Sequence, residues 1–192
     1  MDLKTAFPVS WVLVNELALG PAPTAPRHLG KLGAEGITGV LSLCSTKEVE
    51  VPEDLDLRFH CLRVELPDHR TQGLPSLDQL QQAIDAIAKL RNRGPVFVHC
   101  VAGIERAPLV CIAWLMQQHG LSRQHAFDYL REVHTRTSPS ASQLMLLNQW
   151  NNGASPLIED CLSLCRANAE IAREGSRWAR YRGQYLESWA AA

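Results

Sequence analysis

The 192-residue sequence has no excess of charge of either sign. Its 19 lysines and arginines nearly balance 20 aspartates and glutamates, which leaves a formal net charge of −1 at pH 7. A chain of this kind has no overall field that would draw it to nucleic acid or to an anionic membrane surface. We therefore expect neither nucleic acid nor a membrane among its partners.

Long apolar runs and the pattern of a secretory signal are also missing. A membrane-spanning helix needs about 20 consecutive apolar residues, and no stretch approaches that length. The opening Met1-Asp2-Leu3-Lys4-Thr5 lacks the charged-then-apolar order of a signal peptide. The six cysteines are scattered through core-forming sequence, which suits reduced thiols rather than a disulfide framework. These absences together predict a cytoplasmic protein.

Apolar stretches of strand length alternate with helical patterns in the first half of the chain, and only helical patterns follow. Strands are predicted within 8–19 and at 37–44, 57–66 and 96–99. Helices are predicted to end near 34, to cover 77–90 and 107–119, and to follow Ser122 and Pro139. This order favours an α/β fold with a mostly parallel central sheet of about four to five strands flanked by helices. We expect one domain over 1–152 and a helical C-terminal extension over 153–192.

Two helix starts carry the capping-box signature, in which Ser or Thr is followed three residues later by Glu or Gln. Ser76 with Gln79 opens the helix at 77–90, and Ser140 with Gln143 opens the last helix before residue 150. Gly36 and Gly120 are expected to end the helices that precede them.

The most informative stretch joins the strand at 96–99 to the helix at 107–119. His99-Cys100 ends the strand, Val101-Ala102-Gly103-Ile104-Glu105 forms a loop of mostly small residues, and Arg106 precedes the helix. Strand, tight loop and helix gather backbone N–H groups at a helix N-terminus and aim them at an anion.

A thiol and a guanidinium flank this loop. A helix N-terminus and a neighbouring arginine both favour the thiolate form of a cysteine, and a planar guanidinium matches two phosphoryl oxygens at once. The residues predict a phosphate-binding loop over Val101–Arg106 with Cys100 as nucleophile. The alternative is a buried cysteine at a strand end followed by a surface arginine.

The string His-Cys-x-x-Gly-x-x-Arg at 99–106, followed by Ala113-Trp114-Leu115-Met116, resembles the dual-specificity branch of the cysteine-dependent protein phosphatases. The helix after Leu121-Ser122 and the turn Ser138-Pro139-Ser140 also resemble that family, so the likeness covers about residues 9–150. The resemblance implies that Cys100 attacks a phosphoryl group to form phosphocysteine, which water then hydrolyses. Arg106 and the loop amides would neutralise the phosphoryl charge, so no metal and no other cofactor is expected.

The family also has a general acid on a separate loop, which protonates the leaving oxygen. Asp68 lies just after a predicted strand and Pro67, and its position matches the family's acid-loop aspartate. The alternative for Asp68 is a turn residue, because aspartate beside proline is common in turns. Asp54, Asp56 and Asp78 are weaker candidates, since they fall in a surface run or in the first turn of a helix.

Three residues beside the nucleophile and the arginine have supporting roles or depart from the family pattern. His99 is expected to hold the loop through a ring hydrogen bond. Ala107 replaces the Ser or Thr of most relatives, whose hydroxyl supports the cysteine sulfur as a leaving group, so slower phosphoenzyme breakdown is expected. Glu105 places a carboxylate beside a dianion site; it is either a minor rival for general acid or a residue that faces solvent or forms a salt bridge.

The substrate class follows from the loop and from the resemblance. The loop interior has no lysine or histidine, which disfavours phosphoinositides, so phosphotyrosine and phosphoserine/threonine of proteins are the expected substrates. A non-protein phosphate such as phosphoglucan, and a phosphate-binding pseudophosphatase adaptor, are the alternatives. Cys44, after the second predicted strand, is either a redox partner for Cys100, as in phosphoinositide phosphatases of the superfamily, or a small core residue.

The C-terminal extension has two apolar stripes at helical spacing, which predict either packing on the domain or a dimer or partner interface. Cys161 and Cys165 have no second pair of metal-ligand residues nearby, so a metal site is not expected there. The stripes consist of Leu157, Ile158, Cys161, Leu162 and Cys165, and of Trp178, Tyr181, Tyr185 and Trp189.

Overall fold

The computed structural model describes residues 7–68 and 73–150. The predicted helical extension, its apolar stripes, Cys161 and Cys165, and the predicted domain boundary at 152 lie outside the described residues. Within the described ranges, none of the helices is both long enough and apolar enough to cross a membrane.

A single five-stranded sheet lies at the centre, in the order β1-β2-β5-β3-β4. Its strands are β1 (Ser10–Leu13), β2 (Leu17–Gly20), β3 (Gly39–Ser42), β4 (His60–Arg63) and β5 (Val96–His99). The pair β1–β2 is antiparallel, and the pairs β2–β5, β5–β3 and β3–β4 are parallel. The mostly parallel sheet predicted from the sequence is thereby confirmed.

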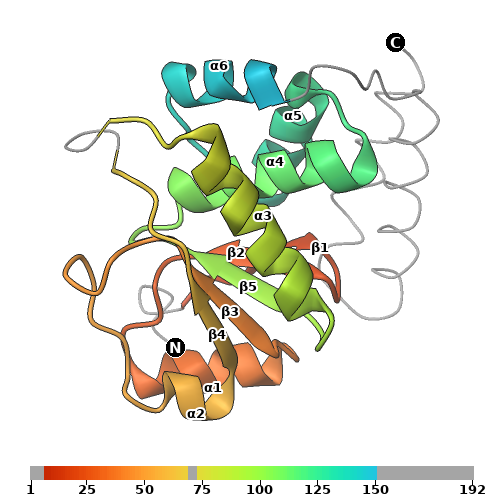
Figure 1. Ribbon diagram of the computed structural model, residues 1–192. Coiled ribbons are helices and arrows are strands. Elements are labelled where there is room, and N and C mark those ends of the chain that lie inside the picture. Colours follow the sequence, from red (N-terminus) through yellow and green to blue (C-terminus); the bar gives the residue numbers. More distant parts are fainter. Residues whose placement is uncertain (1–6, 69–72, 151–192) are drawn as a thin grey trace.

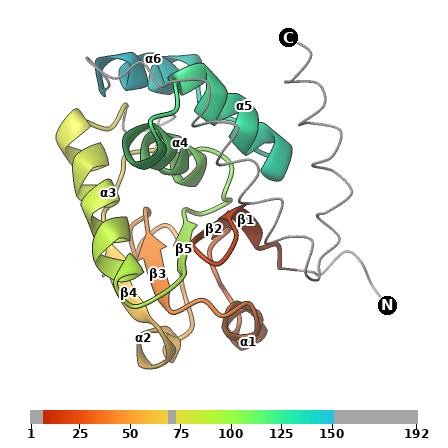
Figure 2. The same cartoon turned by 90° about the vertical axis from the view of Figure 1, so that its right-hand side faces the viewer.

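Helices cover both faces of the sheet, as Figures 1 and 2 show. On one face lie α1 (Pro26–Ala34) and the single turn α2 (Leu55–Arg58). On the other face lie α3 (Leu77–Arg91), α4 (Arg106–His119), α5 (Arg123–Val133) and α6 (Ala141–Trp150). All residues of α4 from Arg106 to Met116 are buried, so this helix forms the middle of the larger layer.

Strand β5 supplies side chains to two separate hydrophobic cores. Val96 and Val98 pack into the larger core with α3 and α4, while Phe97 packs into the smaller one with Leu29 and Leu32 of α1. Because both faces of the strand are buried, its sequence is apolar throughout and shows no alternation with polar residues. Burial on both faces fixes the position of the end of β5, which Cys100 follows directly.

The strand predicted at 57–66 is wrong in its first part. Residues Leu55–Arg58 form the helical turn α2, and the strand β4 begins only at His60. Leu55 and Phe59, four residues apart, are both buried, whereas Leu57 between them is 87% exposed. That spacing is the period of a helix, not of a strand, and the burial of this pair decides the local structure.

The predicted helix caps are confirmed. Ser76 Oγ accepts a hydrogen bond from the Gln79 N–H (3.1 Å), and Gln79 Oε1 accepts one from the Ser76 N–H (2.9 Å). The Ser140–Gln143 pair forms the same reciprocal contacts before α6. These caps satisfy N–H groups that a helix start otherwise leaves without partners, and they set where α3 and α6 begin.

Candidate active site

Cys100 lies at the carboxyl end of the central strand β5 and is 3% exposed. Residues 101–105 form the connecting loop, and α4 begins at Arg106. In parallel α/β sheets, ligands bind beyond the carboxyl ends of the strands. The loop over Val101–Arg106 (the phosphate loop) therefore has the position and the helix N-terminus that an anion site requires.

The phosphate loop is packed against the end of strand β2. The Ala22 N–H donates a hydrogen bond to the Val101 carbonyl (3.1 Å). Gly103 has φ of +69°, and a Cβ at this position would lie 2.4 Å from the carbonyl carbon of Gly20. Glycine is required here both by the left-handed backbone and by the neighbouring chain.

Arg106 is almost fully buried at 4% exposure, and its guanidinium is held by a carboxylate from another loop. Its Nη1 and Nη2 donate to Oε1 (3.1 Å) and Oε2 (2.6 Å) of Glu48, and Nη1 also donates to the Leu66 carbonyl (3.1 Å). Burial lowers the pKa of Arg106, but the contacts with Glu48 together with the nearby Cys100 and Cys44 raise that pKa overall. The same pair lowers the pKa of Glu48. A paired, fixed guanidinium is suited to binding a phosphoryl group.

The His99 side chain lies under the loop and carries no charge at neutral pH. Burial lowers its pKa to about 4. Its Nδ1 lies 3.1 Å from the Cys100 carbonyl, and since a carbonyl only accepts, Nδ1 carries the proton. The ring thus holds the backbone of Cys100, which is the kind of contact expected from the sequence.

Glu105 directs its carboxylate to α6. Its Oε1 accepts a hydrogen bond from Nε2 of Gln143 (2.6 Å), a side chain that is fully buried. This hydrogen bond to a neutral amide is neither the solvent-facing position nor the salt bridge expected from the sequence, and the general-acid role of Glu105 stays a prediction. Ala107, the other departure from the family pattern, is fully buried in the first turn of α4.

Asp68 is half-buried and follows Leu66, whose carbonyl binds the Arg106 guanidinium. The chain that bears Asp68 therefore passes directly beside the phosphate loop. The three weaker candidates lie on or next to helices: Asp54 pairs with Arg58 at 3.7 Å, Asp56 belongs to α2, and Asp78 to the first turn of α3. The acid role of Asp68 stays a prediction.

Cys44 is fully buried just after β3, the strand next to β5. Ser42 pairs with His99 in the parallel register, so Cys44 and Cys100 follow neighbouring strands at the same edge of the sheet. Burial raises the pKa of the Cys44 thiol. Its role as a redox partner is not decided by this arrangement and stays a prediction.

The side chains of Glu48, His134 and Gln143 contact the site directly, and none of these residues is predicted as a site residue from the sequence. Glu48 binds Arg106 from a polar loop whose sequence gives no sign of the pairing. His134 Nε2 lies 2.8 Å from the Gly103 carbonyl, and Gln143 binds Glu105. The sequence predicts Gln143 as part of a capping box, which involves only its amide oxygen. The capping pattern does not predict the hydrogen bond that its amide NH₂ group donates to Glu105.

Comparison with known proteins identifies the family. Residues 17–153 match the model of "Dual specificity phosphatase, catalytic domain". The chain belongs to this family. It is 34% identical over 99 residues to human "Dual specificity protein phosphatase 5", a match that covers 51% of this chain and 25% of that protein. It is also 25% identical over 150 residues to "Phosphatidylglycerophosphate phosphatase PTPMT2" of Arabidopsis thaliana, covering 78% of this chain and 66% of that protein.

Solved structures of other proteins share the fold. The crystal structure of Tk-PTP in the active form superposes with a TM-score of 0.64 at 25% identity, covering 73% of this chain and 94% of that one. PTPMT1 in complex with PI(5)P gives a TM-score of 0.62 at 21% identity, covering 79% and 94%. The chain spans between a quarter and two thirds of the length of the first curated relatives.

Proposed function

We propose that the chain is a phosphomonoester hydrolase that works through a phosphocysteine intermediate. The observation that carries this proposal is Cys100 at the end of β5, directly before a loop that leads into the N-terminus of α4. The Cys100 thiolate attacks phosphorus and forms the P–S bond while the P–O bond to the leaving group breaks. Water then attacks phosphorus, the P–S bond breaks, and inorganic phosphate and the thiolate are released.

The remaining catalytic roles follow from position. Arg106, held by Glu48, and the backbone N–H groups at the start of α4 would stabilise the equatorial phosphoryl oxygens. Asp68 would donate the proton to the leaving oxygen in the first step and take one from water in the second. Residues Val101, Ala102, Gly103, Ile104 and Glu105 would supply the loop backbone around the substrate. The chemistry needs no metal or other cofactor.

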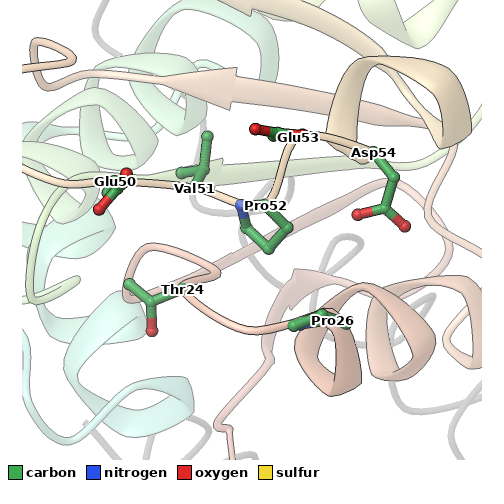
Figure 3. Close-up of a pocket in the computed structure, with 7 residues that line it drawn as sticks. All are labelled: Thr24, Pro26, Glu50, Val51, Pro52, Glu53 and Asp54. Atoms are coloured by element: carbon green, nitrogen blue, oxygen red, sulfur yellow. The ribbon is translucent and has the colours of Figure 1, made fainter.

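Phosphorylated protein is the substrate class that we propose. A surface pocket of about 480 Å³ lies between two segments that reach the phosphate loop (Figure 3). One segment carries Thr24 and Pro26 and follows Ala22, which binds Val101; the other is the run 50–54, which follows Glu48. Three carboxylates, those of Glu50, Glu53 and Asp54, line it. These acidic side chains, next to the two segments that contact the phosphate loop, favour a peptide with basic residues and disfavour an anionic lipid surface.

A phospholipid is the second candidate substrate, because two of the relatives are named phosphatidylglycerophosphate phosphatases and their matches cover 78% and 86% of this chain. The acidic pocket and a loop interior without lysine or histidine speak against this class. Neither the structure nor any of the relatives named above offers support for phosphoglucan, and the intact Cys100 and Arg106 speak against an adaptor without activity. We further propose that the protein acts in the cytoplasm.

The test has two stages. Cys100→Ser is expected to abolish hydrolysis of p-nitrophenyl phosphate, whereas Cys61→Ser, at a half-buried cysteine of strand β4, should retain it. Undiminished hydrolysis by Cys100→Ser would refute the mechanism. The wild-type chain is then compared on basic phosphopeptides, acidic phosphopeptides and phosphatidylglycerophosphate vesicles. A preference for basic phosphopeptides supports the proposed substrate class, and faster hydrolysis of the lipid would replace it.

A further inference from the structure

Three successive residues of the phosphate loop are held by one segment of the chain. The segment over residues 134–143 joins α5 to the first turn of α6. His134 Nε2 lies 2.8 Å from the Gly103 carbonyl, and the Ser138 N–H donates to the Ile104 carbonyl at 2.8 Å. The third contact, at Glu105, is made by a side chain to a side chain and therefore depends on residue identity.

The Gln143 amide has a fixed orientation in this third contact. Its Oε1 accepts a hydrogen bond from the Ser140 N–H (2.8 Å) as part of the helix cap. The amide NH₂ group must then point the other way, and it donates to Oε1 of Glu105 at 2.6 Å. Gln143 is fully buried and Glu105 is half-buried, so the carboxylate gains a charge-assisted partner whose position is fixed by the surrounding packing.

The position of Glu105 makes this contact important. Glu105 is the N-cap residue of α4, and a carboxylate at an N-cap ordinarily folds back to accept hydrogen bonds from the first N–H groups of its own helix. In this chain Glu105 makes no such side-chain cap bond. Those N–H groups and the positive end of the helix are what a phosphate dianion requires, and a carboxylate placed there would compete with it.

We propose that Gln143 is a positioning residue for anion binding: it holds the Glu105 carboxylate on α6 and so keeps it out of the phosphate site. The proposal rests on the proposed function in one respect, namely that the loop binds a phosphate-like anion. On this proposal, Gln143 both caps α6 and positions the Glu105 carboxylate, whereas a purely structural cap would have only the first role.

The variant Gln143→Glu tests this separation of tasks. Glutamate also forms a capping box, so the α6 cap is retained, but its second oxygen cannot donate to Glu105 and instead repels it. The probe is tungstate, a tetrahedral dianion, and binding to the full chain is measured by calorimetry. We expect tungstate to bind about tenfold more weakly, which corresponds to the loss of a hydrogen bond to a charged group.

The decisive measurement is rescue by the double variant Glu105→Gln/Gln143→Glu. It restores a hydrogen bond of reversed polarity and removes the charge from position 105, so tungstate affinity should return to within about threefold of wild type. If the double variant binds as weakly as Gln143→Glu, or if Gln143→Glu binds as tightly as wild type, the proposal is overturned. Ser142→Ala, on an exposed residue of the same helix turn, is the matched control and should bind like wild type.

Turnover of p-nitrophenyl phosphate by the same variants separates this inference from the proposed function. Loss and rescue of tungstate binding in a chain without turnover would support the role of Gln143 and refute the hydrolase proposal. Normal turnover without any effect of Gln143→Glu on KM or on tungstate affinity would support the hydrolase proposal and refute the role of Gln143. A wild-type chain that binds no tungstate would overturn the inference.

Discussion

Glu48 and Arg106 form a two-point ion pair, with Nη1–Oε1 at 3.1 Å and Nη2–Oε2 at 2.6 Å. Arg106 ends the phosphate loop and Glu48 lies 58 residues earlier in the chain; the arginine side chain is 5% exposed and the glutamate side chain is 25% exposed. The pair therefore orients a buried guanidinium from the rim of the site. Breaking it leaves the arginine charge in place but removes its alignment.

The first prediction concerns that alignment. Glu48→Gln should lower kcat/KM for p-nitrophenyl phosphate by about tenfold, because glutamine retains one acceptor oxygen: one of the two contacts to Arg106 is lost and the other is no longer charge-assisted on the acceptor side. Glu132→Gln, at an exposed residue of α5, is the control for removing one carboxylate and should change this value little. Equal kcat/KM for Glu48→Gln and wild type would show that the guanidinium is positioned by its backbone contacts alone.

The second prediction tests the general acid. Asp68→Asn should lower kcat with p-nitrophenyl phosphate by about 10²-fold, within the range that general acid catalysis contributes. It should also flatten the basic limb of the pH–rate profile, because the group that must be protonated in the first step is gone. Asp78→Asn, on the exposed first turn of α3, should leave both rate and profile unchanged. A profile that keeps its basic limb in Asp68→Asn would assign the role to another group.

The third prediction is a pH dependence of stability. His99 has a folded-state pKa of about 4, below its ordinary value of 6.5, so between these values the unfolded chain binds a proton that the native chain does not. Stability therefore falls as the pH drops through this window, by about 1.4 kcal/mol per pH unit for one such group. Urea unfolding of His99→Gln at pH 7, 6 and 5 should give a shallower slope. Identical slopes in both proteins would contradict the burial argument.

The fourth prediction uses two glycines as a matched pair. Gly103→Ala should lose activity and lower the unfolding free energy by several kcal/mol, because its Cβ would overlap the Gly20 backbone at a positive φ. Gly30→Ala, in the exposed part of α1 with no atom within 4 Å of the new Cβ, should be neutral or gain about 0.5–1 kcal/mol. Thermal unfolding and p-nitrophenyl phosphate hydrolysis measure both. An active, stable Gly103→Ala variant would mean that the β2 end can move away.

The fifth prediction concerns oxidation. Treatment with hydrogen peroxide should oxidise Cys100 to the sulfenic acid, and attack by the Cys44 sulfur then forms a disulfide with release of water. Peptide mass spectrometry should find the Cys44–Cys100 bond, and a thiol reductant should restore activity. In Cys44→Ser, peroxide inactivation should proceed to species that a thiol does not reverse. Failure to detect the disulfide in the wild-type chain would leave Cys44 as a core residue only.

Local patterns predicted most of the fold. The capping boxes at Ser76 and Ser140 and the apolar run of β5 each depend on residues close together in sequence, and their elements lie where expected. The helical turn α2 was not predicted because its second half overlaps the apolar stretch 57–66, whose pattern favours a strand. In that case tertiary burial outweighed the local pattern.

The residues of the site likewise fall into those that the sequence predicts and those that it does not. Cys100, the loop and Arg106 are contiguous, so the sequence predicts them together. Glu48 and Gln143 reach the loop from elements that are distant in sequence, and no spacing rule links a glutamate or a glutamine to a loop formed elsewhere in the chain. These contacts arise from the packing of distant segments, and no local pattern in a single sequence reveals which distant segments will meet.

The contact between Gly103 and Gly20 has a consequence for how the protein is made. The two residues are separated by most of the domain, yet a Cβ at Gly103 would meet the Gly20 carbonyl carbon at 2.4 Å. The loop can close only against β2, which leaves the ribosome long before the loop does. A shortened translation product that starts after Gly20 would keep every signature residue from His99 to Arg106. It would still lack strand β2, against which the phosphate loop packs. Intact signature residues in a truncated product would therefore be no measure of enzyme activity.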